Sequence, residues 1–105
     1  MVKNQNTSLA DAMNIYQSKS FENKVKKFNK TQKANLDEEI KKIISEPEIG
    51  TEKKGDLKGI FIHKFKIKAT MYLLSYRHTN DGIELITVGS HVNYYRNMKT
   101  YLKNR

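Results

Sequence analysis

The sequence predicts a single α+β domain, with a helical segment in its first half and an antiparallel sheet in its second half. Apolar residues recur at helical spacing from Phe21 to Ile44. From Lys54 onward, short β-branched and aromatic stretches alternate with glycine or with Asn-Asp-Gly, which is typical of strands joined by tight turns. At 105 residues the chain is long enough for one modest core and too short for two.

The helical segment carries its apolar residues on one stripe, with Lys, Glu and Asn between them. The stripe consists of Phe21, Val25, Phe28, Leu36, Ile40, Ile43 and Ile44. A turn at Asn29-Lys30 with Thr31 as a cap would give two helices, but the apolar phase nearly continues through it. A single helix and a helical hairpin are therefore both compatible with the sequence. Pro47 ends the segment in either case, because proline lacks the backbone donor and disfavours helix in the preceding residue.

Three strands are expected near residues 58–67, 71–78 and 83–89, the last two joined through Asn80-Asp81-Gly82. In the first strand, alternation gives one apolar and one basic face. The apolar face holds Phe61, Phe65 and Ile67, and the basic face holds Lys64, Lys66 and Lys68.

The two ends of the chain differ in character. Residues 1–12 are polar and are expected to form a loosely held arm, in which Ser8 and Asp11 could cap a short turn. After Gly89 the tail returns to helical spacing, with Tyr94, Met98 and Tyr101 or Leu102 on one stripe, which predicts a C-terminal helix.

The chain is strongly basic, with 20 Lys and Arg against 11 Asp and Glu and a formal net charge of +9. Such a surplus attracts polyanions, including RNA, DNA, acidic protein segments and anionic lipid, without choosing among them. The absence of cysteine excludes disulfides and thiolate metal sites. No apolar run is long enough to span a membrane or to form a signal peptide, so we expect a cytoplasmic protein without a membrane partner.

No cofactor or metal is expected, because His63, His78 and His91 are far apart in sequence and no glycine-rich phosphate loop is present. The remaining Lys, Arg, His and Tyr side chains suit cleavage of RNA through its own 2′-hydroxyl. That reaction needs a base for the hydroxyl proton, cations for the phosphorane and an acid for the leaving 5′-oxygen. Taken singly, each of these side chains is more often structural or solubilising, so the hypothesis rests on their combination.

The residues that carry a family resemblance extend from Pro47 to Leu102. They are Pro47-Glu48-Ile49-Gly50, Lys54-Gly55-Asp56-Leu57-Lys58-Gly59, His63-Lys64-Phe65-Lys66, Tyr72-Leu73-Leu74-Ser75-Tyr76-Arg77 and Val88-Gly89-Ser90-His91-Val92-Asn93-Tyr94-Tyr95-Arg96. This pattern resembles the RelE/ParE superfamily of toxins from type II bacterial toxin–antitoxin systems, and with the stretch from Tyr16 it covers most of the chain. The resemblance implies a small curved antiparallel sheet with an N-terminal helical hairpin on one face.

The resemblance also implies site residues for a ribosome-dependent messenger RNA endoribonuclease. Lys64 and Lys66 match the Lys-x-Lys pair of RelE-like toxins, and His91 lies where the nuclease branch carries Arg or His. Leu73 departs from the family, which often has arginine there, and Arg77 on the same strand face is the expected substitute. The predicted catalytic residues are His91, Lys64, Lys66, Arg77 and Tyr95, and the predicted substrate contacts are Lys54, Lys58, Tyr94, Arg96 and Lys99.

Two alternatives stay open at the level of sequence. ParE-like members poison DNA gyrase without nuclease activity, and Leu73 with the long helical tail from Val92 to Arg105 fits that branch. A plain nucleic-acid-binding module is a third, weaker reading. Whether Tyr94 or Tyr95 lines the site depends on where the tail helix begins. The family also implies a cognate antitoxin, whose acidic or amphipathic segment would cover the cationic sheet.

Overall fold

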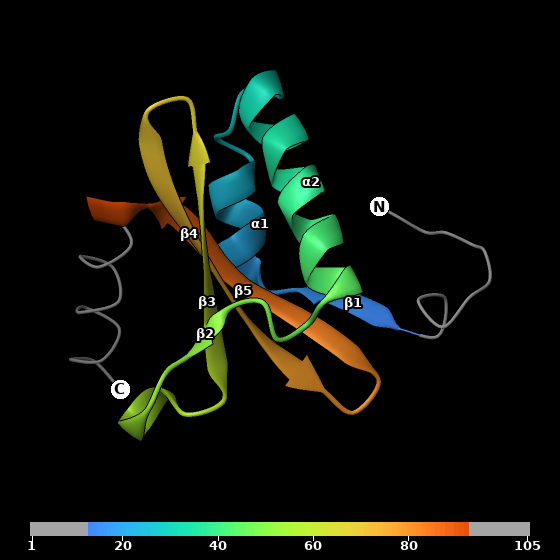
Figure 1. The fold of residues 1–105 in the computed structure, drawn as a ribbon. Helices are drawn as coiled ribbons and strands as arrows, with labels where there is room; N and C mark the ends of the chain where they lie inside the picture. Colours follow the sequence, from blue (N-terminus) through green and yellow to red (C-terminus); the bar gives the residue numbers. More distant parts are fainter. Residues whose placement is uncertain (1–12, 93–105) are drawn as a thin grey trace.

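The structure is a computed structural model that describes residues 13–92 (Figure 1). Its elements, in chain order, are β1 (Asn14–Gln17), α1 (Lys19–Val25), α2 (Lys30–Ser45), β2 (Thr51–Glu52), a 3-10 turn (Gly55–Leu57), β3 (Ile60–Ile67), β4 (Thr70–Thr79) and β5 (Gly82–Ser90). The α+β class and the three long strands predicted from sequence are confirmed. The predicted tail helix and N-terminal arm lie outside the described residues.

The helical segment forms two helices rather than one. Polar capping residues start each helix, although the apolar residues keep nearly the same helical spacing through the turn between them. Ser18 caps α1 by accepting a hydrogen bond from the Phe21 amide at 3.1 Å. Asn29, and not Thr31, caps α2: its side chain accepts from the Gln32 amide at 2.8 Å, while the Gln32 side chain accepts from the Asn29 amide at 2.7 Å. This reciprocal capping box fixes the start of α2 after a short turn.

The five strands form one sheet in the order β1-β5-β4-β3-β2. Neighbours β2 through β5 are antiparallel, as expected. The expectation of a purely antiparallel sheet is wrong, however, since β1 pairs in parallel with β5, with Asn14 opposite Gly82. The chain returns from β1 to the neighbouring β5 only after both helices and three other strands, so this pairing is non-local and leaves no periodic signal.

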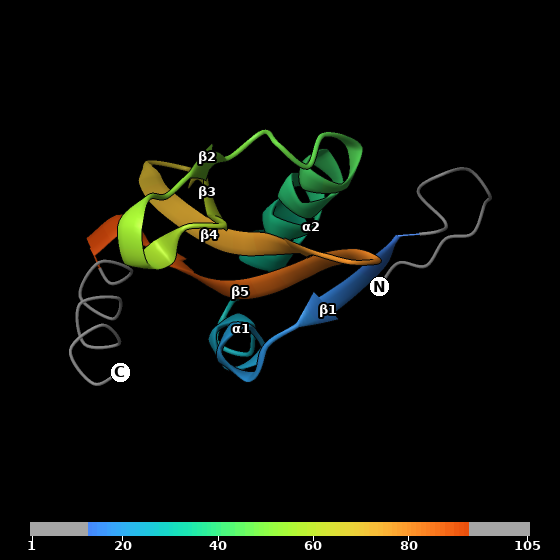
Figure 2. The same cartoon turned by 90° about the horizontal axis from the view of Figure 1, so that it is seen from below.

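The core lies between the sheet and the helices. In Figure 2, α2 lies on one side of the sheet, while α1 lies beside β1 and β5. Alternate residues of β3 and β4 point toward α2, as do apolar residues of β5. The buried cluster consists of Phe21, Leu36, Ile43, Phe65, Ile67, Leu74, Tyr76, Ile83, Leu85 and Val88.

The segment between α2 and β2 is fixed by a buried tyrosine. The Tyr76 hydroxyl donates to the Pro47 carbonyl at 2.7 Å and accepts from the Gly50 amide at 3.0 Å. A Cβ at Gly50 would lie 2.9 Å from both the Ile62 carbonyl oxygen and the Tyr76 hydroxyl, which explains the glycine at this close approach. Neither of the two described helices is long and apolar enough to cross a membrane.

Candidate functional site

The face of the sheet opposite α2 carries two of the predicted catalytic lysines. Lys64 and Lys66 alternate along β3 with the buried Phe65 and Ile67, so their side chains point away from the core and are exposed. No ion pair within residues 13–92 includes either lysine. Both ammonium groups are therefore available to an anion. The predicted division of β3 into apolar and basic faces is confirmed for these four residues.

Strand register places His91 at the same end of the sheet as this pair. Lys66 lies opposite Met71, the neighbouring Tyr72 lies opposite Ser90, and His91 follows directly as an exposed residue. The backbone of His91 is therefore about two interstrand spacings, or about 10 Å, from that of Lys66. Long lysine side chains and an imidazole at this separation can reach the same bound phosphate.

The neighbouring row of paired residues across β3, β4 and β5 ends in a glycine. Lys64 lies opposite Leu73, which lies opposite Gly89. No atom of the described residues comes within 4 Å of the position that a Cβ of Gly89 would occupy. A glycine in a strand often marks a place where another backbone approaches closely. The Cβ position of Gly89 is thus open, whereas Leu73, between Gly89 and Lys64, is buried.

Leu73 replaces the arginine that family resemblance led us to expect, and the structure gives it a packing role. Its side chain is completely buried, in a small cluster with Ile62 and Ile60 on the face opposite α2. An arginine here would place a guanidinium among apolar neighbours. The expected phosphate clamp is therefore replaced by apolar packing under Lys64.

Arg77 lies on the same face but is not brought together with the lysine pair. It lies opposite Ile60 and Glu84, four residues along the strand from Leu73, which corresponds to about 13 Å. Its Nε donates to Glu84 Oε1 at 2.7 Å, and its side chain is 52% exposed. Glu84 thus already compensates the charge that was expected to clamp a phosphate.

Lys54 and Lys58 lie at the Arg77 end of β3. They flank the 3-10 turn, whose shape depends on positive φ angles of 69° at Gly55 and 93° at Gly59. Glu52 holds the turn by accepting a hydrogen bond from the Gly59 amide at 3.1 Å. Both lysines are exposed. They extend the basic surface along β3, away from His91.

The remaining predicted site residues, Tyr94, Tyr95, Arg96 and Lys99, lie outside the described residues. Their roles stay predictions. Within residues 13–92, no group of three His, Asp or Glu side chains is arranged to hold a metal ion.

Sequence reasoning gave no role to His63, and the structure supplies one. His63 points toward α2, is 8% exposed, and its Nε2 lies 2.7 Å from Glu39 Oε1. Partial burial alone would raise the pKa of Glu39, but hydrogen bonds from His63 and from Lys42 outweigh it and hold that pKa below its ordinary value. This pair fastens α2 to the strand that carries Lys64. Only the three-dimensional fold brings the two residues together.

A second polar cluster fastens β1 to the β4–β5 turn. Asp81 Oδ2 accepts from the Tyr16 hydroxyl at 2.8 Å and from Asn14 Nδ2 at 2.9 Å. These hydrogen bonds hold the pKa of Asp81 below its ordinary value, and the same carboxylate raises the pKa of Tyr16.

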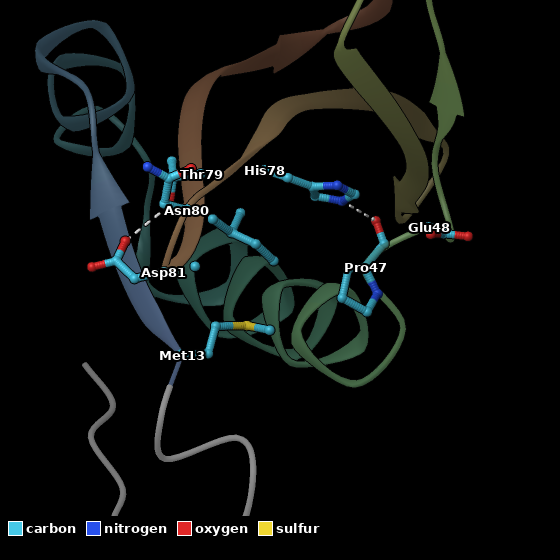
Figure 3. A pocket seen from close by; sticks show the side chains of 9 residues that line it. Met13, Pro47, Glu48, His78, Thr79, Asn80 and Asp81 are labelled. Carbon is cyan, nitrogen blue, oxygen red and sulfur yellow. Dashed lines mark hydrogen bonds between the residues drawn. The ribbon is translucent and has the colours of Figure 1, made fainter.

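Beside this cluster is a pocket of about 480 Å³ between the end of α2 and the β4–β5 turn (Figure 3). His78 points across it toward the Pro47 carbonyl, 3.2 Å from Nε2. The pocket is lined by Met13, Pro47, Glu48, His78, Thr79, Asn80, Asp81, Gly82 and Ile83. It carries two carboxylates and no Lys or Arg, so it is not part of the basic surface of β3.

Comparison with known proteins agrees with the fold and with the resemblance. The isolated Escherichia coli RelE toxin aligns with a TM-score of 0.60 and 19% identity, covering 86% of this chain and 99% of that one. RelE in the intact E. coli RelBE toxin–antitoxin complex aligns with a TM-score of 0.60 and 19% identity, covering 74% of this chain and 95% of that one. An E. coli RelE double arginine mutant bound to an antitoxin RelB peptide aligns with a TM-score of 0.60 and 16% identity, covering 83% of this chain and 94% of that one. No curated protein sequence matches significantly.

At this level of identity the structural matches establish a RelE-like fold. The assignment to a family comes from a model for "ParE-like toxin of type II bacterial toxin-antitoxin system", which matches residues 15–99. That range contains every described element from Ile15 onward and both exposed lysines of β3. The chain therefore belongs to the ParE-like toxins of type II bacterial toxin–antitoxin systems.

Proposed function

We propose that this toxin is an endoribonuclease that cuts messenger RNA on the ribosome without a metal ion. The observation that carries the proposal is the placement of Lys64 and Lys66. Both are exposed, unpaired among the described residues and on one sheet face, at the end where His91 follows β5. Cations and a group that titrates near neutral pH are what 2′-hydroxyl-mediated cleavage requires.

In the proposed reaction the 2′-oxygen of the substrate loses its proton and attacks the adjacent phosphorus. The bond from phosphorus to the 5′-oxygen breaks, and that oxygen receives a proton. The products are a 2′,3′-cyclic phosphate and a 5′-hydroxyl. Lys64 and Lys66 stabilise the additional negative charge on the phosphorane, and His91 acts as general base or general acid. Tyr94 or Tyr95 and Arg96 are proposed to contact the substrate.

Dependence on the ribosome follows from the incomplete set of groups. Leu73 contributes no charge and Arg77 is paired with Glu84, so fewer cations surround the phosphate than resemblance led us to expect. Positioning of the substrate by the ribosome would compensate, because orientation alone can supply a large part of the rate enhancement. A cognate antitoxin is the expected partner, since E. coli RelE has been solved with its antitoxin.

The alternative is a non-enzymatic inhibitor of DNA gyrase. Two observations favour it: the matching family is described as ParE-like, and Leu73 fills the position of a clamp that only a nuclease needs. On this alternative the lysines of β3 form a binding surface, and His91 has no chemical role.

Inducible expression of the wild type and of His91→Ala in a bacterium separates the two functions. The nuclease proposal expects growth arrest with new messenger RNA 5′-ends inside codons, and both effects should disappear in the variant. The gyrase alternative expects intact messages, DNA damage and altered plasmid supercoiling, with the variant still toxic.

A further inference from the structure

The connection between α1 and α2 carries a second concentration of positive charge, separate from the lysines of β3. Between Lys24 and Lys33, five of ten residues are lysine and none is acidic. We call these the hairpin lysines: Lys24, Lys26, Lys27, Lys30 and Lys33. Four are exposed and Lys24 is half-buried. No ion pair in the described part of the chain includes any of them.

The charge is placed where it opposes helix stability. Lys30 and Lys33 lie at the start of the 16-residue helix α2, and its first turn contains no acidic residue. The partial positive charge of a helix N-terminus favours carboxylates there and disfavours cations. The capping box is also neutral, built from Asn29 and Gln32, where a glutamate often occupies the second position. Every position that commonly carries an acid is neutral or basic.

Elsewhere in the same helix, lysines are compensated. Lys41 lies 3.4 Å from Glu38, and Lys42 lies 3.1 Å from Glu39. General basicity does not explain this contrast within one helix. An external anion at the N-terminal end of α2 would explain it.

The connection between α1 and α2, which carries the hairpin lysines, lies at the same end of the molecule as the turn between β3 and β4 (Figure 1). Gln32 Nε2 donates to the Tyr72 hydroxyl at 2.8 Å, and the Phe28 ring packs edge-on against the Tyr72 ring at 5.8 Å. Tyr72 in turn lies opposite Phe65, between Lys64 and Lys66. Cations therefore surround this end of the molecule on both sides of the sheet.

We propose that the hairpin lysines bind the sugar–phosphate backbone of a nucleic acid, as a surface distinct from the sheet face. A row of phosphates matches several uncompensated lysines on one short segment better than a single carboxylate does. The proposal does not depend on whether the toxin cleaves messenger RNA or inhibits gyrase.

The test measures binding of the purified toxin to a short fluorescein-labelled RNA duplex, and to a DNA duplex of the same sequence, between about 50 and 200 mM salt. Lys27→Gln/Lys30→Gln should weaken binding about tenfold and lower the salt slope by about 1–2. Lys26→Gln/Lys33→Gln, a second pair from the same group, should act in the same way. Binding of both duplexes identifies the phosphate backbone as the ligand, and binding of RNA alone restricts it to RNA.

Lys41→Gln/Lys42→Gln is the matched control, since it removes the same charge from the far end of α2. It should change affinity by no more than about twofold. Equal losses in the hairpin and control variants would show that only net charge matters, and would overturn the proposal. So would unchanged duplex binding together with lost binding of a purified antitoxin, because an acidic protein would then be the occupant. Circular dichroism confirms that each variant is folded.

Discussion

At the scale of single residues, the two lysines of β3 are the groups on which the proposed chemistry depends most. Lys64→Ala or Lys66→Ala should lower the rate of ribosome-dependent messenger RNA cleavage by about a hundredfold, because each removes a cation aimed at the phosphorane. Arg77→Gln should have a smaller effect, since Arg77 is paired with Glu84 and lies about 13 Å along the strand. Single-turnover cleavage of a message on stalled ribosomes measures both.

Lys41→Ala is the control for loss of one exposed lysine, and it should leave the cleavage rate unchanged. If the Lys64 and Lys66 variants cleaved as fast as this control, the lysine pair would have no part in catalysis. If Arg77→Gln were the more damaging change, the phosphate would lie nearer the other end of β3.

The Glu39–His63 contact predicts how stability depends on pH. The pKa of Glu39 is lower in the folded protein than its ordinary value of 4.5, so its contribution is fully present above that value. The contribution is lost as the pH falls through the folded pKa. Glu39→Gln should therefore cost about 1–3 kcal/mol at pH 7 and less at pH 3.

Urea denaturation at both pH values measures this difference. Glu38→Gln, one residue earlier and exposed, is the control and should cost less than about 0.5 kcal/mol. A loss from Glu39→Gln that is equal at pH 7 and pH 3 would show that packing, rather than the charge of the carboxylate, fastens α2 to β3.

At the scale of elements, β1 depends on Gly82, which the local sequence marks only as part of the Asn80-Asp81-Gly82 turn. A Cβ on Gly82 would lie 1.8 Å from the Asn14 carbonyl oxygen, so β1 could not keep its parallel register beside β5. Gly82→Ala should cost about 2 kcal/mol or more. Gly89→Ala is the matched control in the same strand, because the described residues leave its Cβ position open. Thermal denaturation of the two variants should separate them, and equal melting temperatures would contradict this role of Gly82.

The turn between β3 and β4 contains a strained lysine. Lys68 adopts a φ of 58°, a left-handed conformation that costs a residue with a side chain roughly 1–2 kcal/mol. Lys68→Gly should therefore stabilise the protein by about 1 kcal/mol in urea denaturation. The neighbouring Ala69 has no positive φ, so Ala69→Gly should destabilise it. Loss of stability in both variants would contradict the assignment of strain to Lys68.

Much of the fold was predictable because it is encoded locally. The strands expected near residues 58–67, 71–78 and 83–89 agree closely with β3, β4 and β5, since alternation and turn residues mark them. What could not be predicted is non-local. The parallel pairing of β1 depends on residues far apart in sequence. The division into two helices depends on the cap at Asn29, which the nearly continuous spacing of the apolar residues does not reveal.

The candidate site was predictable to the same extent. Lys64 and Lys66 were placed correctly on the exposed face of β3 by simple alternation. Arg77 was expected to join them, but it lies about 13 Å along the strand from the row of Lys64, and the register shift between Ser75 and Tyr76 places it opposite Glu84. Without that bulge it would lie opposite Leu85. One irregular residue in β5 thus decides whether the arginine is paired, and no pattern in the sequence reports it.

At the scale of the whole molecule, a chain with a net charge of +9 carries two groups of lysines at one end of its sheet. The lysines of β3 lie on the face opposite α2, at the end of the sheet where His91 follows β5, while the hairpin lysines lie at the N-terminal end of α2. Family membership gives a toxin of a type II system, and the proposal adds that one of these surfaces performs metal-free cleavage.

The most direct test of that proposal is to identify the products formed when the purified toxin acts on a defined message bound to stalled ribosomes. The proposal predicts a cut within a codon that leaves a 2′,3′-cyclic phosphate and a 5′-hydroxyl, abolished by His91→Ala and by Lys64→Ala. Intact message, together with gyrase-dependent double-strand breaks in a parallel assay with plasmid DNA, would contradict it.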